Sequence, residues 1–192
     1  MPKYIKKYAV TGIMKKKLLL HTCCGPCSTH CVKELLKDYD VVMYFYNPNI
    51  HPCGEYARRL EAEQKVSDSL GVPLVEGSYD IEDWLEQITG FEEEPEGGKR
   101  CEICFAMRLR NAAEYAKKNG FDCFTTTLSI SPHKDSKLIN DLGLAAAKQF
   151  GVAWVDSDFK KKDGFKKSAE MSKELGLYRQ TYCGCFYSVK SK

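Results

Sequence analysis

Short, largely apolar runs alternate along the chain with segments of helical periodicity. The runs at 17–21 and 41–46 are rich in β-formers, as expected for strands covered on both faces, and weaker or shorter runs follow at 73–75, 123–128 and 152–155. Helical patterns occupy the intervals and the end of the chain, at 28–36, 55–70, 81–88, 101–118, 132–150 and 165–175. This alternation implies right-handed β-α-β crossovers and a parallel sheet of about five strands flanked by helices. We therefore predict one Rossmann-like α/β domain.

A basic segment precedes the first predicted strand. We predict an N-terminal extension over residues 1–16, which contains several lysines, and a single α/β domain over residues 17–192. The extension lacks the continuous apolar region and small-residue cleavage site of a secretory signal, and no apolar run approaches the roughly 20 residues of a membrane span. We therefore expect a cytoplasmic protein without a membrane partner.

Ten cysteines are present among the 192 residues. A domain of this length buries roughly 70% of its unfolded surface, so it can form a core without disulfide or metal crosslinks. In a reducing cytoplasm, clustered cysteines more often mean metal or redox chemistry than structural disulfides. Cys31, the last cysteine of the first cluster, and the isolated Cys123 are expected to be small buried core residues, whereas the pattern assigns no role to the isolated Cys53.

The sharpest local motif is His21-Thr-Cys-Cys-Gly-Pro-Cys27, between the first predicted strand and the first helix. In open α/β sheets, ligands bind at this carboxyl-end turn. Exposed amides at the start of a helix favour negative charge, which lowers thiolate pKa values. His21 itself is expected either to orient a ligand or supply a proton, or to be a hydrogen-bonded structural residue.

A second motif, Cys101-Glu-Ile-Cys104, opens a strongly predicted helix, where the spacing places both sulfurs on one face. Alone it fits a zinc half-site, half an iron–sulfur site or a redox dithiol. Together with Cys23 and Cys24 it supplies four thiolates, enough for one iron–sulfur cluster. Cys27 is then a surplus thiol, which either binds a second metal or packs.

The third motif, Tyr182-Cys-Gly-Cys-Phe186, has two cysteines one residue apart. Oxidation would close a very small, strained ring that is easily reduced. A reversible dithiol is the leading interpretation of Cys183 and Cys185, with additional metal ligation or an inert tail as alternatives. Basic runs elsewhere are taken as solvated surface, because a net charge of +3 is a weak signal for nucleic-acid binding.

Five motifs in this order resemble the QueH family of epoxyqueuosine reductases, cobalamin-independent enzymes of tRNA queuosine biosynthesis. Besides the first motif they are Tyr46-Asn-Pro-Asn-Ile-His-Pro52 with Glu55-Tyr-Ala-Arg-Arg59, Arg100-Cys-Glu-Ile-Cys-Phe105 with Arg108-Leu109, Phe124-Thr-Thr-Thr-Leu-Ser-Ile-Ser-Pro132, and Tyr178-Arg-Gln-Thr-Tyr-Cys-Gly-Cys185. The resemblance covers most of the chain from His21 to Phe186, and it implies a fold of the HUP or ATP-pyrophosphatase-like kind.

The resemblance further implies a [4Fe-4S] cluster held by Cys23, Cys24, Cys101 and Cys104, and a redox-active disulfide between Cys183 and Cys185. The implied reaction removes the epoxide oxygen of epoxyqueuosine at tRNA position 34, with two electrons from an unidentified donor. An additional iron or other metal ion, using Cys27, is a hypothesis for binding the leaving oxygen. Because the substrate base lies in a single-stranded loop, stacking on Tyr56 or Tyr182 is expected.

Two other functions compete with this interpretation. The first is an iron–sulfur tRNA-thiolating enzyme of similar architecture, which needs a Ser-Gly-Gly phosphate loop where this chain has Cys-Cys-Gly-Pro-Cys. The second is a zinc-stabilised, non-catalytic nucleic-acid-binding module, in which the cysteines are purely structural.

Overall fold

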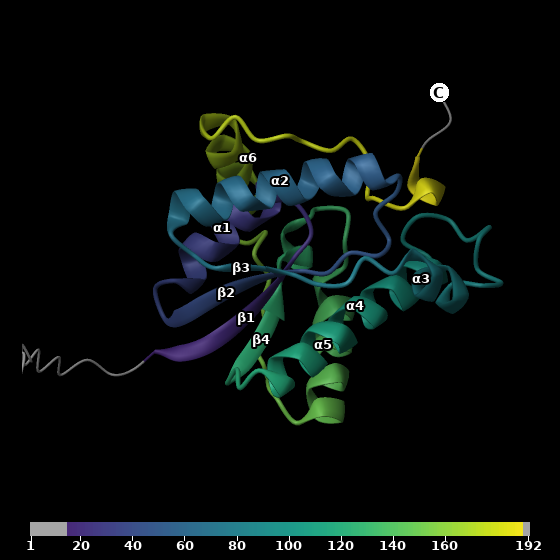
Figure 1. Cartoon of the computed structure of the whole chain (residues 1–192), viewed down its shortest axis with the longest axis horizontal. Coiled ribbons are helices and arrows are strands. Elements are labelled where there is room, and N and C mark those ends of the chain that lie inside the picture. Colours follow the sequence, from purple (N-terminus) through teal and green to yellow (C-terminus); the bar gives the residue numbers. More distant parts are fainter. Residues whose placement is uncertain (1–14, 190–192) are drawn as a thin grey trace, which may run out of the picture.

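The computed structural model of the chain describes residues 15–189 (Figure 1). Residues 1–14, which make up most of the predicted basic extension, lie outside the described residues. Lys16, assigned to that extension from the sequence, instead begins the first strand.

Five parallel strands form one sheet in the order β3-β2-β1-β4-β5. They are β1 (Lys16–Thr22), β2 (Tyr39–Phe45), β3 (Leu74–Glu76), β4 (Cys123–Thr126) and β5 (Ala153–Trp154). The predicted α/β class and parallel sheet are therefore confirmed. From β1 the chain builds outward to β3 and then returns to place β4 on the other side of β1, so the strand order reverses between β1 and β4.

Helices cover both faces of the sheet (Figure 1). On one face, α1 (Gly25–Leu35) packs against both α2 (Cys53–Leu70) and α6 (Gly164–Glu174). On the other face, α4 (Lys99–Lys118) packs against α5 (Ser136–Phe150), and the short α3 (Ile81–Gln87) contacts α4. Two 3-10 helices complete the described elements, η1 (Thr127–Ile130) and η2 (Phe186–Ser188).

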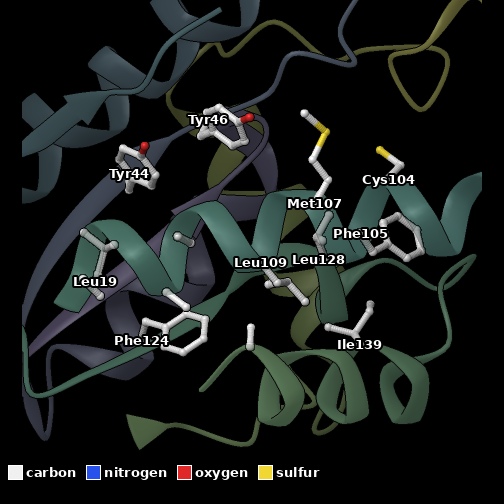
Figure 2. Close-up of a cluster of buried hydrophobic side chains, with 14 of the residues drawn as sticks. Leu19, Tyr44, Tyr46, Cys104, Phe105, Met107, Leu109, Phe124, Leu128 and Ile139 are labelled. Carbon is white, nitrogen blue, oxygen red and sulfur yellow. The ribbon is translucent and has the colours of Figure 1, made fainter. Parts of the chain in front are cut away.

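Successive residues of β1 enter different cores, because side chains alternate across a strand. Leu18 and Leu20 pack with α1 and the C-terminal part of α2, whereas Leu19 packs in the cluster that α4 and α5 cover. Figure 2 shows Leu109, Leu128 and Ile139 converging between α4 and α5 in this second cluster. Two apolar layers therefore hold the central strand, and its carboxyl end is a fixed point for the residues that follow.

Several element boundaries differ from the predicted ones because local hydrogen bonds decide them. The predicted strand 123–128 ends at Thr126, whose side-chain oxygen accepts from Leu128 N at 3.2 Å and starts η1. The predicted helix 132–150 begins only at Ser136, because Asp135 caps it by accepting from Lys137 N at 2.7 Å. None of the helices within residues 15–189 has the length and apolar character to cross a membrane.

Candidate active site

The first cysteine motif lies at the carboxyl edge of the sheet, where the strand order reverses. Thr22 ends β1, Cys23 and Cys24 form the turn, and Gly25 begins α1. The end of β4 lies beside this turn, because His21 is paired with Thr126 and the Cys23 thiol is 3.8 Å from the Thr127 hydroxyl. Ligands bind at such topological switch points in open α/β sheets.

Three thiols of this turn are close neighbours. The sulfurs of Cys23, Cys24 and Cys27 all lie within 4.8 Å of one another, which is a spacing that can hold a metal. Hydrogen bonds from the thiols of Cys24 and Cys27 hold the pKa of Cys23 well below its usual range. The buried Cys24 thiol also accepts from the Gln180 side-chain amide at 2.9 Å. Cys27 is thus part of the group rather than a separate packing residue.

The second pair of predicted ligands lies on the first two turns of α4. The backbone N–H of Gly97 donates to the Cys101 sulfur at 3.2 Å, and burial raises the pKa of Cys101. Burial also raises the pKa of Cys104 to about 11. Within residues 15–189, neither thiol belongs to the 4.8 Å group formed by the first turn. The structure therefore brings three cysteines of the first motif within metal-ligand spacing of one another, and the assignment of Cys101 and Cys104 to the same site stays a prediction.

Arg108 connects the two sets of thiols. Its side chain is only 2% exposed, and its charge is close enough to Cys104 and Cys23 to act on both. One guanidinium nitrogen donates to the Asn47 side chain at 2.6 Å, and Asn47 in turn donates to the carbonyl of Thr22 at 2.9 Å. The Nε of Arg108 has no partner, and no carboxylate pairs with this arginine in the described chain. A buried, unpaired cation of this kind favours an anionic group beside it.

The third cysteine motif is held by side chains of α2 rather than by secondary structure. Arg59 donates to the carbonyls of Cys183 at 2.9 Å and Tyr182 at 3.0 Å, and it is paired with the buried Glu55 at 2.7 Å. Gly184 has a φ of +142°, which L-residues rarely adopt, and its carbonyl accepts from His51 N at 2.9 Å. Both thiols are free, so the predicted disulfide stays a prediction.

The first and third motifs border one pocket of about 920 Å³, which we call the thiol pocket. Cys23, Cys27 and Cys183 line it directly, and Gly97, the donor to Cys101, forms part of its wall. Lys134 lines it as well, and burial opposes the charge of this side chain. Negative charge on the sulfurs of Cys183, Cys23 and Cys27 nevertheless holds the pKa of the lysine above its ordinary value. The pocket therefore combines nucleophilic sulfur with fixed positive charge.

His21 is the hydrogen-bonded structural residue rather than a free proton donor. Its Nε2 lies 3.1 Å from the Tyr46 carbonyl and therefore carries the proton, which leaves Nδ1 to accept from the Thr126 hydroxyl at 2.7 Å. Burial, together with the nearby Arg108 charge, lowers the pKa of His21 to about 3. Both ring nitrogens are engaged, and the ring is neutral.

Other expectations have mixed outcomes. Cys31 and Cys123 are buried core residues, as predicted, and Cys53 is an exposed residue at the start of α2. Stacking of a substrate base on Tyr56 is wrong, because this ring is packed between Phe45 and Tyr79, away from the thiol pocket. Tyr182 does line the pocket.

The sequence interpretation missed two arginines, which it assigned to solvated surface. Arg59 and Arg108 are each only 2% exposed. A signal was present for Arg108, because it lies three residues after Phe105 and four before Ala112, on the apolar face of α4.

Comparisons with known proteins agree with the site. The chain matches the family described as epoxyqueuosine reductase QueH over residues 18–191. It is 42% identical to the epoxyqueuosine reductase QueH of Streptococcus pyogenes over 183 residues, which cover 92% of this chain and 72% of that protein. The relative from Thermotoga maritima is 35% identical, with 90% of each chain covered, and that from Dehalococcoides mccartyi is 40% identical, with 91% and 93% covered. This chain belongs to the epoxyqueuosine reductase QueH family of oxidoreductases.

Proposed function

We propose that this chain reduces epoxyqueuosine at position 34 of tRNA to queuosine. The observation that carries the proposal is the thiol pocket itself, in which cysteines from separate segments meet beside the buried, unpaired Arg108. Family membership supports the reaction and favours neither the tRNA-thiolating enzyme nor the zinc-stabilised module. The partners are tRNA that contains epoxyqueuosine and an electron donor of unknown identity, and we propose that they meet in the cytoplasm.

Cys23, Cys24, Cys101 and Cys104 are the proposed ligands of a [4Fe-4S] cluster. Four thiolates are the usual donor set of such a cluster. The buried Arg108 guanidinium offsets negative charge near Cys104 and Cys23, and N–H donors reach the sulfurs of Cys24 and Cys101. When bound, the cluster supplies single-electron transfer and Lewis acidity. Cys27 remains the proposed ligand of an additional iron or other metal ion.

Cys183 and Cys185 are the proposed source of the two electrons. Two thiols that become one disulfide release two electrons and two protons. Both carbon–oxygen bonds of the epoxide break, a carbon–carbon double bond forms, and the oxygen leaves with the two protons as water, so atoms and charge balance. The external donor then reduces the disulfide. Lys134 faces the same pocket, where its ammonium stabilises negative charge on the departing oxygen.

The direct test is nucleoside mass spectrometry of epoxyqueuosine-containing tRNA after anaerobic incubation with the protein and a reductant. We expect conversion to queuosine by the natural chain and none by Cys101→Ala, which loses a proposed cluster ligand. Cys183→Ser should keep the metal and lose turnover. Cys53→Ala is the matched control, because this exposed cysteine lies outside the pocket.

Iron and sulfide analysis of the same preparations separates the assignments. Four irons and four sulfides per chain support the cluster alone, and further metal that is lost in Cys27→Ala supports the second site. A colourless zinc protein contradicts the proposed cofactor. Unchanged epoxyqueuosine with fully loaded natural protein contradicts the proposed reaction.

A further inference from the structure

Phe165 is an exposed aromatic side chain of the thiol pocket without a stacking partner in the described fold. Three aromatic side chains line the pocket, those of Tyr182, Phe165 and the exposed His133, and the two larger rings belong to Tyr182 and Phe165. The Tyr182 side chain already has partners within the chain, because its hydroxyl donates to the His51 carbonyl and its ring centroid lies 5.3 Å from the Arg59 guanidinium. Phe165 is 42% exposed, and within residues 15–189 it has neither a stacked ring nor a cation over its face.

The backbone before Phe165 has a restricted shape. Lys162 and Asp163 have φ values of 54° and 61°, in the left-handed region that non-glycine residues seldom enter. Gly164 follows, and a Cβ there would lie 1.7 Å from the carbonyl oxygen of Phe159, so only glycine fits. A turn with such a restricted backbone fixes where α6 starts and where the backbone of its second residue, Phe165, lies.

Helix α6 is also tied to the cysteine turn. The Ser168 hydroxyl donates to the carbonyl of Pro26, the residue before Cys27, and the Thr29 hydroxyl donates to the Ser168 carbonyl at 3.4 Å. Ser168 is one helical turn after Phe165, and both residues line the pocket. The backbone that carries the exposed ring is therefore held in a fixed position relative to the cysteine turn.

The charged residues around the ring suit a phosphate-bearing ligand. Lys134 and Arg179 line the same pocket, with Glu96 as the acidic residue on its wall. Exposed aromatic rings next to cationic side chains are how proteins grip single-stranded RNA, since bases stack on the ring while phosphates meet the cations. Of the exposed large apolar side chains within residues 15–189, Phe165 is the aromatic one that lines this pocket.

We propose that Phe165 is the stacking platform for the substrate base, and that it presents the flipped-out nucleotide to the thiols of the pocket. This inference rests on the proposed function, since it takes the pocket to receive a nucleotide of the tRNA anticodon loop. It replaces the stacking on Tyr56 or Tyr182 that the sequence suggested, and it makes Phe165 a positioning residue for the reaction.

The test measures binding of fluorescently labelled anticodon stem-loop RNA to the metal-loaded protein by anisotropy. Phe165→Ala and Phe165→Leu should weaken binding about 5- to 100-fold, because loss of one base–aromatic stack has that effect, whereas Phe165→Trp should restore it. The slope of log Kd against log salt should not change, since no phosphate contact is removed. Leu144→Ala is the matched control, an exposed apolar residue of α5 that does not line the pocket.

Two outcomes separate the inference from the function on which it rests. If the natural protein converts epoxyqueuosine in tRNA but Phe165→Ala binds RNA within twofold of it, the stacking role is wrong. If the metal-loaded natural protein leaves epoxyqueuosine in tRNA unchanged, the proposed function is wrong, whatever affinity the variants have for RNA. Metal content and thermal unfolding of each variant should match the natural chain, because the exposed ring supports no core cluster.

Discussion

The Cys23–Cys27 turn and the Tyr182–Cys185 segment both face the thiol pocket, yet different forces hold them. The turn continues directly from the buried strand β1 into α1, so backbone hydrogen bonds of regular elements fix it. The C-terminal segment belongs to neither a strand nor an α-helix, and side chains of α2 hold its carbonyls.

The difference suits the two proposed roles. Ligands of a cluster need a rigid frame, because metal sites tolerate little displacement of their ligands. A dithiol that opens and closes needs local freedom around a fixed anchor. The Glu55–Arg59 pair supplies that anchor, and Gly184 supplies a backbone shape that other residues rarely adopt. Damage to the anchor should therefore affect the C-terminal segment while the Cys23–Cys27 turn stays intact.

The largest expected effect comes from Arg59→Met. It leaves the buried Glu55 carboxylate without its main partner, which should destabilise the protein by about 3–5 kcal/mol. Loss of the two bonds to the segment should also lower the reduction rate by about 100-fold, the scale of a displacement near 1 Å. Chemical denaturation and single-turnover kinetics would measure both effects.

The matched control is Arg58→Met on the same helix. Arg58 also pairs with Glu55, but its side chain is 59% exposed, so the cost should stay within about 1 kcal/mol. Hydrogen exchange should show lost protection in the C-terminal segment of the Arg59 variant alone. Equal loss of protection at the Cys23–Cys27 turn would contradict the division into two independently held regions.

Gly184→Ala should produce the next largest effect. The φ of +142° costs a residue with a side chain about 1–3 kcal/mol, and a Cβ there would lie 3.1 Å from the Ile50 side chain. Gly54→Ala is the control, because nothing lies within 4 Å of a Cβ at this position of α2. Alanine there should leave stability unchanged or raise it by up to about 1 kcal/mol. Equal unfolding midpoints for the two variants would show that the segment tolerates other shapes.

Arg108→Met tests the other region, the Cys23–Cys27 turn. The residue links the Cys23 turn to Cys104 through its charge and reaches Thr22 through Asn47. Supporting residues of metal sites usually contribute about 10- to 100-fold in metal affinity, and we expect a loss of that size. Competition with a chelator would measure it, with the exposed Arg110→Met on the same helix as control. Unchanged metal affinity would mean that the buried cation serves only the fold.

The position of the Cys23–Cys27 turn was largely predictable, because residues close to it in the sequence determine it. The apolar run at 18–20 and the β-rich run at 41–46 specify the strands, and strand ends specify where the Cys23–Cys27 turn lies. Burial of Cys31 and Cys123 follows from the same periodicity. The positions of these residues depend on neighbours within one or two elements.

The sequence predicted the Tyr182–Cys185 segment only as a motif, without the side chains that hold it in place. Long cationic side chains are usually exposed, so the burial of Arg59 contradicts the default expectation. Its pairing with Glu55 is local, but its bonds to Tyr182 and Cys183 span more than 120 residues. Side-chain bonds between distant loops leave no periodic pattern, which is why neither this anchor nor the exposed Phe165 could be assigned from the sequence.

Tyr182→Phe should have the smallest effect and would show which bond anchors the segment. The substitution removes one hydroxyl that donates to the His51 carbonyl but keeps the ring beneath Arg59. A neutral hydrogen bond of this kind contributes about 0.5–1.5 kcal/mol, and Tyr39→Phe, where the hydroxyl has no partner among residues 15–189, should cost nothing measurable. Because the bonds from Arg59 to the carbonyls of Tyr182 and Cys183 remain, the reduction rate should stay within a few-fold of the natural chain. A loss as large as that of Arg59→Met would place the anchor at Tyr182, and the buried ion pair would then stabilise α2 without positioning the dithiol.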